Sequence, residues 1–467
     1  MTETCPDFDT DVAVVGAGIT GLVAAHHLAA GGLKVQVLEA QDRAGGAIGT
    51  TTLAGFRLEH GPNSLLDTNP ALHELFDRLG IADELVYAGE EARNRYIVRN
   101  GRLHPLPMSP PALIRSGLLT TRGKLRLLAE PFIGRGPADV EETLAEFVER
   151  RLGREFLDYA IDAFVAGVYA GVPQRLSVRD AFPKLYRLEE RYGSILKGAV
   201  LGRRERRRSG RTAKQSARMF SFREGLQTLV DALAREQGQA LQLSTRLKIL
   251  SRHDVGYALE LEGADGPSRL TARAVLLAIP AHAYPEVHAE LDLAEARQAL
   301  AQIYSPPVTM LFFGYRKKPA GHPLDGFGFL IPAREQRRIL GTLFSSTLFP
   351  GRAPDGGVAL TTFVGGVRQP DLALLPDGEL IELVRGELAD LLQIDVAPDE
   401  VALRRWPRAI PQYQVGHREL IAAVERTEDR YPGLYLAGNF RGGISVSDCI
   451  EQATRLSERV VAALPRS

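Results

Sequence analysis

The segment DVAVVGAGITGLVAAHHLAAGGLKVQVLE, residues 11–39, determines how the rest of the chain is organised. It begins with an apolar run, Val12–Val15, followed by the loop Gly16-Ala17-Gly18-Ile19-Thr20-Gly21 and a helical stretch. A second apolar run, Val35–Leu38, ends at the carboxylate of Glu39. A strand, a glycine loop, a helix, a strand and an acid in this order predict a βαβ dinucleotide-binding unit.

The three glycines of the loop have separate physical roles in such a unit. Gly16 permits the tight turn, Gly18 lets the backbone approach a pyrophosphate, and Gly21 brings helix and strand close together. The anion then lies on the unpaired amides at the helix N-terminus. Glu39 can accept hydrogen bonds from ribose hydroxyls and would repel a ribose phosphate, which argues against NADP. The alternative is a glycine-rich turn without a ligand, and the complete pattern argues against it.

The composition is that of an ordinary soluble protein. The chain has 467 residues, of which 45% are hydrophobic and 24% charged, and this length suggests two or three domains. Lys plus Arg and Asp plus Glu number 57 each, so the overall charge indicates no nucleic-acid partner. The two cysteines, Cys5 and Cys449, form neither a disulfide framework nor a zinc motif. We therefore expect a reducing, cytoplasmic compartment and no metal.

The sequence also gives no sign of a targeting or membrane-spanning segment. Residues 1–10 carry acids and no basic region, so we expect no secretory signal. Every stretch of about twenty residues contains charges or helix breakers, so we expect no spanning helix.

A second glycine-rich loop, Arg43-Ala44-Gly45-Gly46-Ala47, follows the second predicted strand. Its amides and the Arg43 side chain could reach the same pyrophosphate. Simple Rossmann NAD enzymes do not need this loop, whereas many FAD enzymes have one. Together with Gly16–Gly21 and Glu39, it resembles the FAD superfamily that contains amine oxidases, phytoene desaturases and protoporphyrinogen oxidases. Amine oxidases usually carry arginine where this chain has Ala47, which favours the porphyrinogen branch.

Three later segments strengthen this resemblance. The turn Gly61-Pro62-Asn63-Ser64 resembles the segment that passes the flavin in protoporphyrinogen oxidases, although an ordinary turn would have the same sequence. The segment Arg405–His417, which contains Trp406, closely resembles the same enzymes. Residues 433–446 read as a strand, a glycine turn and a helix N-terminus. Such a turn would direct amides and a helix dipole at the electron-rich side of a reduced flavin, and a plain helix cap is the alternative.

The resemblance implies noncovalent FAD and a set of residues that hold it. Asn439 stands where many relatives have an acid, so a contact with the ribityl chain would be altered. Leu247 would touch the adenine, although a buried strand without a ligand would look the same. The implied cofactor residues are Gly16, Gly18, Ile19, Thr20, Gly21, Glu39, Ala40, Arg43, Gly45, Gly46, Ala47, Gly61, Pro62, Asn63, Leu247, Trp406, Gly438, Asn439, Ser445 and Val446.

The order of the predicted elements indicates an α/β protein with three parts. Strand-like segments between residues 308 and 364 are rich in β-branched and aromatic residues and suggest one antiparallel sheet. The expected parts are a Rossmann-like FAD-binding domain (residues 1–80, 214–285 and 405–467), a substrate-binding domain (81–101 and 286–404) and a helical domain (102–213).

The predicted helical domain has the features of a surface that binds to a membrane. Leucines and basic residues alternate from Leu113 to Leu128, which predicts amphipathic helices with a cationic face. The run Arg203–Arg211 adds six arginines in nine positions. We therefore expect a peripheral contact with the cytoplasmic membrane face. An ordinary solvated face over a helical core is the alternative.

The resemblance covers nearly the whole chain and implies an FAD-dependent oxidase of bacterial haem biosynthesis. Such enzymes carry out the six-electron oxidation of protoporphyrinogen IX to protoporphyrin IX with dioxygen as acceptor. Oxidation of coproporphyrinogen III and a non-catalytic flavin-fold scaffold are the alternatives. No Ser-His-Asp order, zinc-spaced histidines or P-loop stands out in the sequence, so we assign no catalytic acid or base.

The same resemblance implies a substrate site. By position, Phe327, Leu330 and Phe344 would clamp the macrocycle, Arg95 would pair with a propionate, and Asn63 would face the substrate as well as the flavin. Alternatively, the two phenylalanines belong to the core of the sheet and Arg95 is solvated. The resemblance also leaves room for a homodimer and for handover of the product to ferrochelatase.

Overall fold

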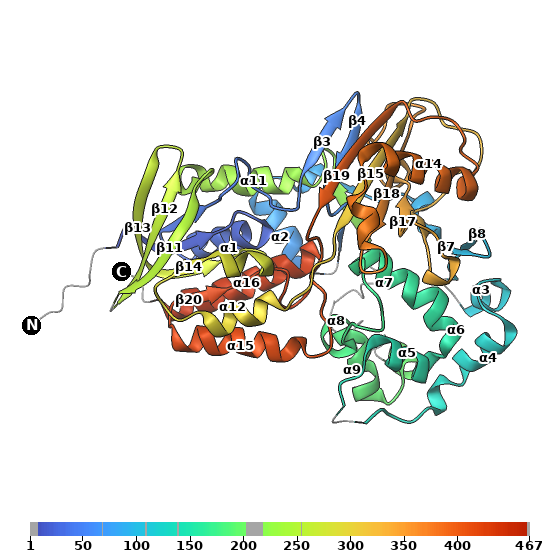
Figure 1. The fold of residues 1–467 in the computed structure, drawn as a ribbon, viewed down its shortest axis with the longest axis horizontal. Helices are drawn as coiled ribbons and strands as arrows, with labels where there is room; N and C mark the ends of the chain where they lie inside the picture. Colours follow the sequence, from blue (N-terminus) through green and yellow to red (C-terminus); the bar gives the residue numbers. More distant parts are fainter. Residues whose placement is uncertain are drawn as a thin grey trace, which may run out of the picture.

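The computed structural model describes residues 8–67, 69–107, 110–137, 140–201, 218–253 and 255–464. Figure 1 shows a sheet with helices on both sides at the left, a second sheet at the upper right, and a group of helices below that second sheet. The α/β fold is therefore confirmed. Arg203–Arg211, which the sequence singled out, lies outside the described residues.

The first sheet has the strand order β10-β2-β1-β13-β12-β11-β14, with β20 beside β13. Its centre is parallel: β1 pairs with β2 on one side and with β13 on the other. The bounds are β1 (Thr10–Val15), β2 (Val35–Leu38), β10 (Leu241–Gln242), β11 (Arg246–His253), β12 (Gly256–Gly263), β13 (Gly266–Leu277), β14 (His288–Ala289) and β20 (Leu434–Leu436).

The continuous apolar run in β1 results from burial on both faces of this sheet. Val12 and Val14 pack into the core beneath α1 (Ile19–Ala30), α11 (Gln227–Gln237) and α16 (Val446–Ala463). Ala13 and Val15 point to the other face, whose core includes residues of α12 (Ala294–Ala301) and α15 (His417–Arg430). The helix α1 begins directly after the glycine loop, as the sequence predicts.

The second sheet has the order β19-β15-β18-β17-β16-β7-β8 and packs against α14 (Asp377–Leu392). Its strands are β7 (Arg95–Arg99), β8 (Arg102–Pro105), β15 (Val308–Tyr315), β16 (Gly328–Leu330), β17 (Gly341–Leu343), β18 (Val358–Gly365) and β19 (Glu400–Trp406). The strands between residues 308 and 364 pair antiparallel with one another, as expected, and β16 also pairs in parallel with β7. A strand from the first part of the chain joins the sheet there.

The helical part surrounds a core of its own. At its centre the Glu130 carboxylate accepts hydrogen bonds from the Arg151 guanidinium, the Ser194 hydroxyl and the amides of Ile195 and Leu196. Such pairing compensates for the burial of two charges. The helices are α3 (Pro110–Arg115), α4 (Thr121–Leu128), α5 (Leu144–Leu152), α6 (Arg154–Phe156), a π-helical turn (Leu157–Ile161), α7 (Asp162–Tyr169), α8 (Val178–Ala181) and α9 (Pro183–Tyr192).

The remaining elements connect these parts. They are β3 (Thr50–Leu53), β4 (Phe56–Glu59), β5 (Leu65–Leu66), α2 (Pro70–Arg78), β6 (Leu85–Tyr87), β9 (Met219–Phe222) and α13 (Ser345–Leu348). Within the described ranges, no helix is long and apolar enough to cross a membrane.

We propose to shift two of the expected domain boundaries, because contacts cross both of them. The strand β6 pairs with β9 and its side chains pack on the core of the first sheet, so the boundary after residue 80 moves to just before β7. Likewise β14 pairs with β11, and α12 packs on α15, so the boundary after residue 285 moves beyond α12. In this division, the two chain segments that form the domain of the second sheet begin with β7 and β15.

Candidate active site

The glycine loop after β1 forms a cradle at the N-terminus of α1. Gly16 has a φ of +103°, and a Cβ there would lie 2.6 Å from the Ala278 carbonyl oxygen. At Gly21 a Cβ would lie 1.9 Å from the Gly16 carbonyl oxygen, so this glycine sets the close packing of helix and strand. A Cβ on Gly18, in contrast, would meet no protein atom within 4 Å. The open side of Gly18 is therefore where a ligand can approach the backbone.

The carboxylate of Glu39 closes the cradle at the end of β2. Its Oε2 accepts a hydrogen bond from the Ala17 amide at 2.7 Å, and its Oε1 accepts one from the Gln41 amide at 2.9 Å. These bonds fix the carboxylate beside the glycine loop. Each oxygen keeps a second lone pair for a ribose hydroxyl.

The Arg43 side chain contacts the backbone of the second glycine loop. Its guanidinium donates to the carbonyl oxygens of Gly46 (2.6 Å), Ile48 (2.8 Å) and Ala44 (3.2 Å), and burial lowers its pKa. The side chain does not line the cavity described below. These hydrogen bonds hold the second glycine loop in shape, and the contact of Arg43 with a pyrophosphate stays a prediction.

A cavity of about 3270 Å³ extends from this cradle to the second sheet and the helical part. Pockets for one drug-sized ligand usually measure about 300–1,000 Å³, so there is room for a dinucleotide and a second large molecule. Every predicted cofactor residue except Gly21 and Arg43 lines the cavity, which brings together the first loop, the second loop, the Gly61–Asn63 turn, Leu247, Trp406 and the turn before α16.

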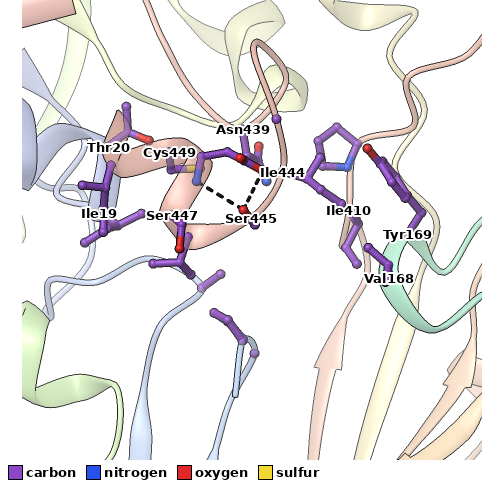
Figure 2. A pocket seen from close by; sticks show the side chains of 18 of the residues that line it. Ile19, Thr20, Val168, Tyr169, Ile410, Asn439, Ile444, Ser445, Ser447 and Cys449 are labelled. Carbon is purple, nitrogen blue, oxygen red and sulfur yellow. Dashed lines mark hydrogen bonds between the residues drawn. The ribbon is translucent and has the colours of Figure 1, made fainter. Parts of the chain in front are cut away.

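The turn before α16 lies at the middle of the cavity. Figure 2 shows Asn439, Ile444 and Ser445 on this turn next to Ile19 and Thr20 of α1. Ser445 is the N-cap of α16, and its hydroxyl accepts a hydrogen bond from the Asp448 amide at 3.2 Å. The helix end directs its positive dipole toward the cavity, although Asp448 places a carboxylate in the first turn.

The Gly61–Asn63 turn is held by one hydrogen bond from β19 to the residue before it and by one hydrogen bond within the turn. The Trp406 indole donates to the His60 carbonyl at 2.7 Å, and the Asn63 side-chain amide donates to the Gly61 carbonyl at 3.0 Å. Trp406 is the last residue of β19, so the second sheet fixes this turn against the cavity.

Arg95, Phe327 and Leu330 line the far end of the cavity. The Arg95 guanidinium carbon lies 5.2 Å from the centre of the Phe327 ring, a cation–π distance. Burial lowers the pKa of Arg95, while its side chain stays accessible because it borders the cavity. Among the described residues no carboxylate forms an ion pair with Arg95.

The structure corrects the prediction for Phe344. This side chain is fully buried, lies in the core of the second sheet and does not line the cavity. Its ring packs against Phe329 with a centroid distance of 6.2 Å and against His322 at 5.7 Å. Phe344 therefore belongs to the sheet core, the alternative that the sequence left open.

The sequence did not identify α7 as part of this site. Val168 and Tyr169 of α7 line the cavity, together with Ile410 from the segment after β19, and Figure 2 shows these three across from the α16 turn. At Gly167 a Cβ would lie 2.4 Å from the Leu330 side chain, so α7 packs directly on the second sheet. The run of small residues Ala166-Gly167 was the only available signal for this contact.

The cavity thus joins the dinucleotide cradle to an apolar chamber lined by Phe327, Leu330, Val168 and Ile410, an arrangement that fits a flavoprotein oxidoreductase. The sequence matches the family described as flavin containing amine oxidoreductase over residues 19–461, and the chain belongs to this family.

Similar proteins span almost the whole chain. It is 34% identical to the chloroplastic protoporphyrinogen oxidase of Nicotiana tabacum, over 99% of this chain and 87% of that protein. It is 28% identical to the coproporphyrinogen III oxidase of Bacillus subtilis, over 94% and 96%. A crystal structure from Exiguobacterium, provisionally named a protoporphyrinogen oxidase, matches with a TM-score of 0.81 at 26% identity, over 98% of this chain and 99% of that one.

The site fits FAD, the cofactor of this family. The open face of Gly18 would take the pyrophosphate, Glu39 the ribose, and the cavity near Leu247 the adenine. The amides of the α16 turn would face the isoalloxazine end. Cys449 of α16 is buried, and burial raises the pKa of its thiol to about 12.

Proposed function

We propose that this protein oxidises protoporphyrinogen IX to protoporphyrin IX with FAD, and that dioxygen is the electron acceptor. The Nicotiana tabacum relative, which carries the name of this activity, supports the proposal. The observation that carries it is the position of Arg95, a cation without an ion-pair partner among the described residues, on an apolar chamber that adjoins the dinucleotide cradle.

The chamber suits a large apolar ring with a few carboxylates. Phe327 and Leu330 line one side, and Val168 and Ile410 line another. At about 25 cal/mol per Å² of apolar surface, burial of a tetrapyrrole supplies most of the binding free energy. An exposed ion pair adds only about 0–1 kcal/mol, so Arg95 would mainly orient the ring through one propionate.

The reaction requires three rounds, which together remove three hydrides and three protons: four of these six hydrogens leave the meso carbons and two leave the pyrrole nitrogens. When bound, FAD accepts the hydride and passes two electrons to dioxygen, which leaves as hydrogen peroxide. The residues of the chain place the ring beside the cofactor and exclude water from it. Three peroxides would therefore form for each protoporphyrin.

Coproporphyrinogen III is the second candidate, because the Bacillus subtilis relative is named for it and because cations line one arm of the cavity. These are Lys184, Arg187 and Arg191 of α9. A second basic cluster, between β16 and β17, is occupied: Arg334 pairs with Asp158, and Arg337 pairs with Glu387 and Asp390. None of that cluster lines the cavity, which favours protoporphyrinogen.

Turnover of the two porphyrinogens side by side tests the proposal. Holoenzyme should convert protoporphyrinogen with the higher kcat/KM, read as porphyrin fluorescence. A preference for coproporphyrinogen would reject the substrate assignment, and flavin binding without turnover of either compound would indicate a scaffold.

We also propose that the helical part touches the cytoplasmic membrane surface. Leu125, Leu128 and Phe132 near α4 are 64%, 60% and 88% exposed, while Leu118, Leu119 and Leu127 are buried in cores. Exposed apolar side chains beside basic residues suit an anionic lipid surface. A homodimer and handover of the product to ferrochelatase stay predictions from the resemblance.

A further inference from the structure

The turn from Asn439 to Gly443 connects β20 to α16 and forms part of the cavity wall. Gly442 and Gly443 have positive φ values of +79° and +133°, so the backbone here has conformations that only glycine adopts easily. A glycine turn loses much conformational entropy when it is fixed. Contacts from other segments are therefore needed to hold the turn, and with it the α16 N-terminus, in one position.

The hydroxyl of Tyr413 bridges the two ends of this turn. It donates to the Asn439 carbonyl oxygen at 2.7 Å and accepts from the Gly443 amide at 3.0 Å. Tyr413 is 2% exposed, and burial raises its pKa well above the ordinary value, so the hydroxyl keeps its proton. One side chain thus satisfies two backbone groups at the cofactor side of the cavity.

His417 stacks on Tyr413 and forms a hydrogen bond with the middle of the same turn. Its ring stacks on the Tyr413 ring with a centroid distance of 4.1 Å and an interplanar angle of 13°. Its Nε2 lies 2.9 Å from the Phe440 carbonyl oxygen and donates to it. Burial lowers the pKa of His417, and its Nδ1 is buried without a hydrogen-bond partner. The carbonyl partner requires a proton on Nε2, and the unpartnered Nδ1 and the lowered pKa both favour the neutral imidazole.

The segment that carries these two side chains is also tied to the helical part. The Ser177 amide donates to the Tyr413 carbonyl at 2.8 Å, and the Gln412 side chain donates to the Tyr169 carbonyl at 2.7 Å. Tyr169 lines the cavity from α7, as Figure 2 shows. Residues 412–417 therefore join the wall of the second chamber to the turn that faces the cofactor.

We propose that Tyr413 is a positioning residue for the flavin: it fixes the Asn439–Gly443 turn, and with it the α16 N-terminus, against the bound cofactor, and His417 holds its ring in place. The inference rests on FAD binding at this cavity and does not depend on which porphyrinogen is oxidised.

The test compares two buried tyrosines in holoenzyme. Tyr413→Phe removes the bridging hydroxyl and keeps the ring that stacks on His417. Tyr257→Phe is the matched control, because the Tyr257 hydroxyl also bridges two backbone groups, the carbonyls of Tyr431 and Pro432, but neither of these bridged residues lines the cavity. Release of FAD after dilution is followed by the rise in free-flavin fluorescence, and the visible absorption bands of bound flavin are recorded.

Tyr413→Phe should release FAD about tenfold faster than the wild type and shift the flavin bands, because two buried backbone groups lose their partner. Tyr257→Phe should do neither, although it lowers thermal stability. Equal FAD release by both variants, or an unchanged spectrum in Tyr413→Phe, would overturn the proposal. If Tyr413→Phe does not fold, His417→Gln, which can still donate to Phe440, should give the same spectral shift, and its absence would also overturn the proposal.

Discussion

The variant Gly18→Ala tests whether the first glycine loop binds a ligand or is an ordinary glycine turn. Gly18 has φ −69° and ψ 173°, values that alanine adopts without strain, and its Cβ would meet no protein atom within 4 Å. Alanine is a poorer N-cap than glycine by up to about 1 kcal/mol. The same change stabilises by about 0.4–1 kcal/mol through the unfolded chain. These effects nearly cancel, so the stability of the cofactor-free protein should change by less than about 1 kcal/mol.

The added methyl should nevertheless reduce FAD binding, because it occupies the space that the pyrophosphate approaches. Overfilling a well-packed contact costs about 1–3 kcal/mol, which corresponds to a rise in Kd of about 5- to 150-fold. Flavin fluorescence gives the Kd and thermal unfolding gives the stability.

Two further glycines provide the controls. Gly386→Ala in α14 also meets no atom within 4 Å and should leave FAD binding unchanged. Gly21→Ala should destabilise the fold, because its Cβ would lie 1.9 Å from a carbonyl oxygen. Wild-type affinity for FAD in Gly18→Ala would refute the assignment of this loop as the pyrophosphate site.

The other predictions concern the substrate, the core, pH and the membrane. Arg95→Ala should raise the KM for protoporphyrinogen several-fold with little change in kcat, and Arg95→Lys should recover part of the loss; an unchanged KM would mean that Arg95 is merely solvated. Phe344→Ala should lower the free energy of unfolding by about 3–5 kcal/mol, measured by urea denaturation, and an effect confined to KM would restore a direct substrate role. Burial lowers the pKa of His27 to about 4, so the unfolded chain binds an extra proton between about pH 6.5 and 4, and stability should fall as pH drops through this window, but less in His27→Gln. Phe132→Glu should weaken flotation with anionic liposomes, and wild-type protein that never floats would contradict the membrane proposal.

The cofactor half of the site could be predicted because its signals are local. The turn at Gly16, the open approach at Gly18 and the acid at Glu39 depend on neighbours within one βαβ unit, and the structure places all three at one cradle. The Asn100-Gly101 pair is a local signal of the same kind, because an Asn-Gly dipeptide favours a hairpin turn and both residues have positive φ between β7 and β8.

The substrate half depends on contacts between distant segments, and there sequence reasoning was less successful. Phe344 follows the last residue of β17 and precedes α13, so strand alternation no longer decides which way its side chain points. The hydrogen bonds from Arg43 to the carbonyls of its own loop likewise depend on how that loop folds. The role of α7 arises from packing of Gly167 on Leu330, residues far apart in the chain.

Anaerobic mixing of the holoenzyme with protoporphyrinogen IX tests the central claim most directly, because it observes electron transfer from this substrate to the bound flavin without dioxygen. The account predicts that the visible flavin absorption bleaches within one turnover and returns when air is admitted, with hydrogen peroxide released. Flavin that stays oxidised in the presence of saturating protoporphyrinogen would contradict the account.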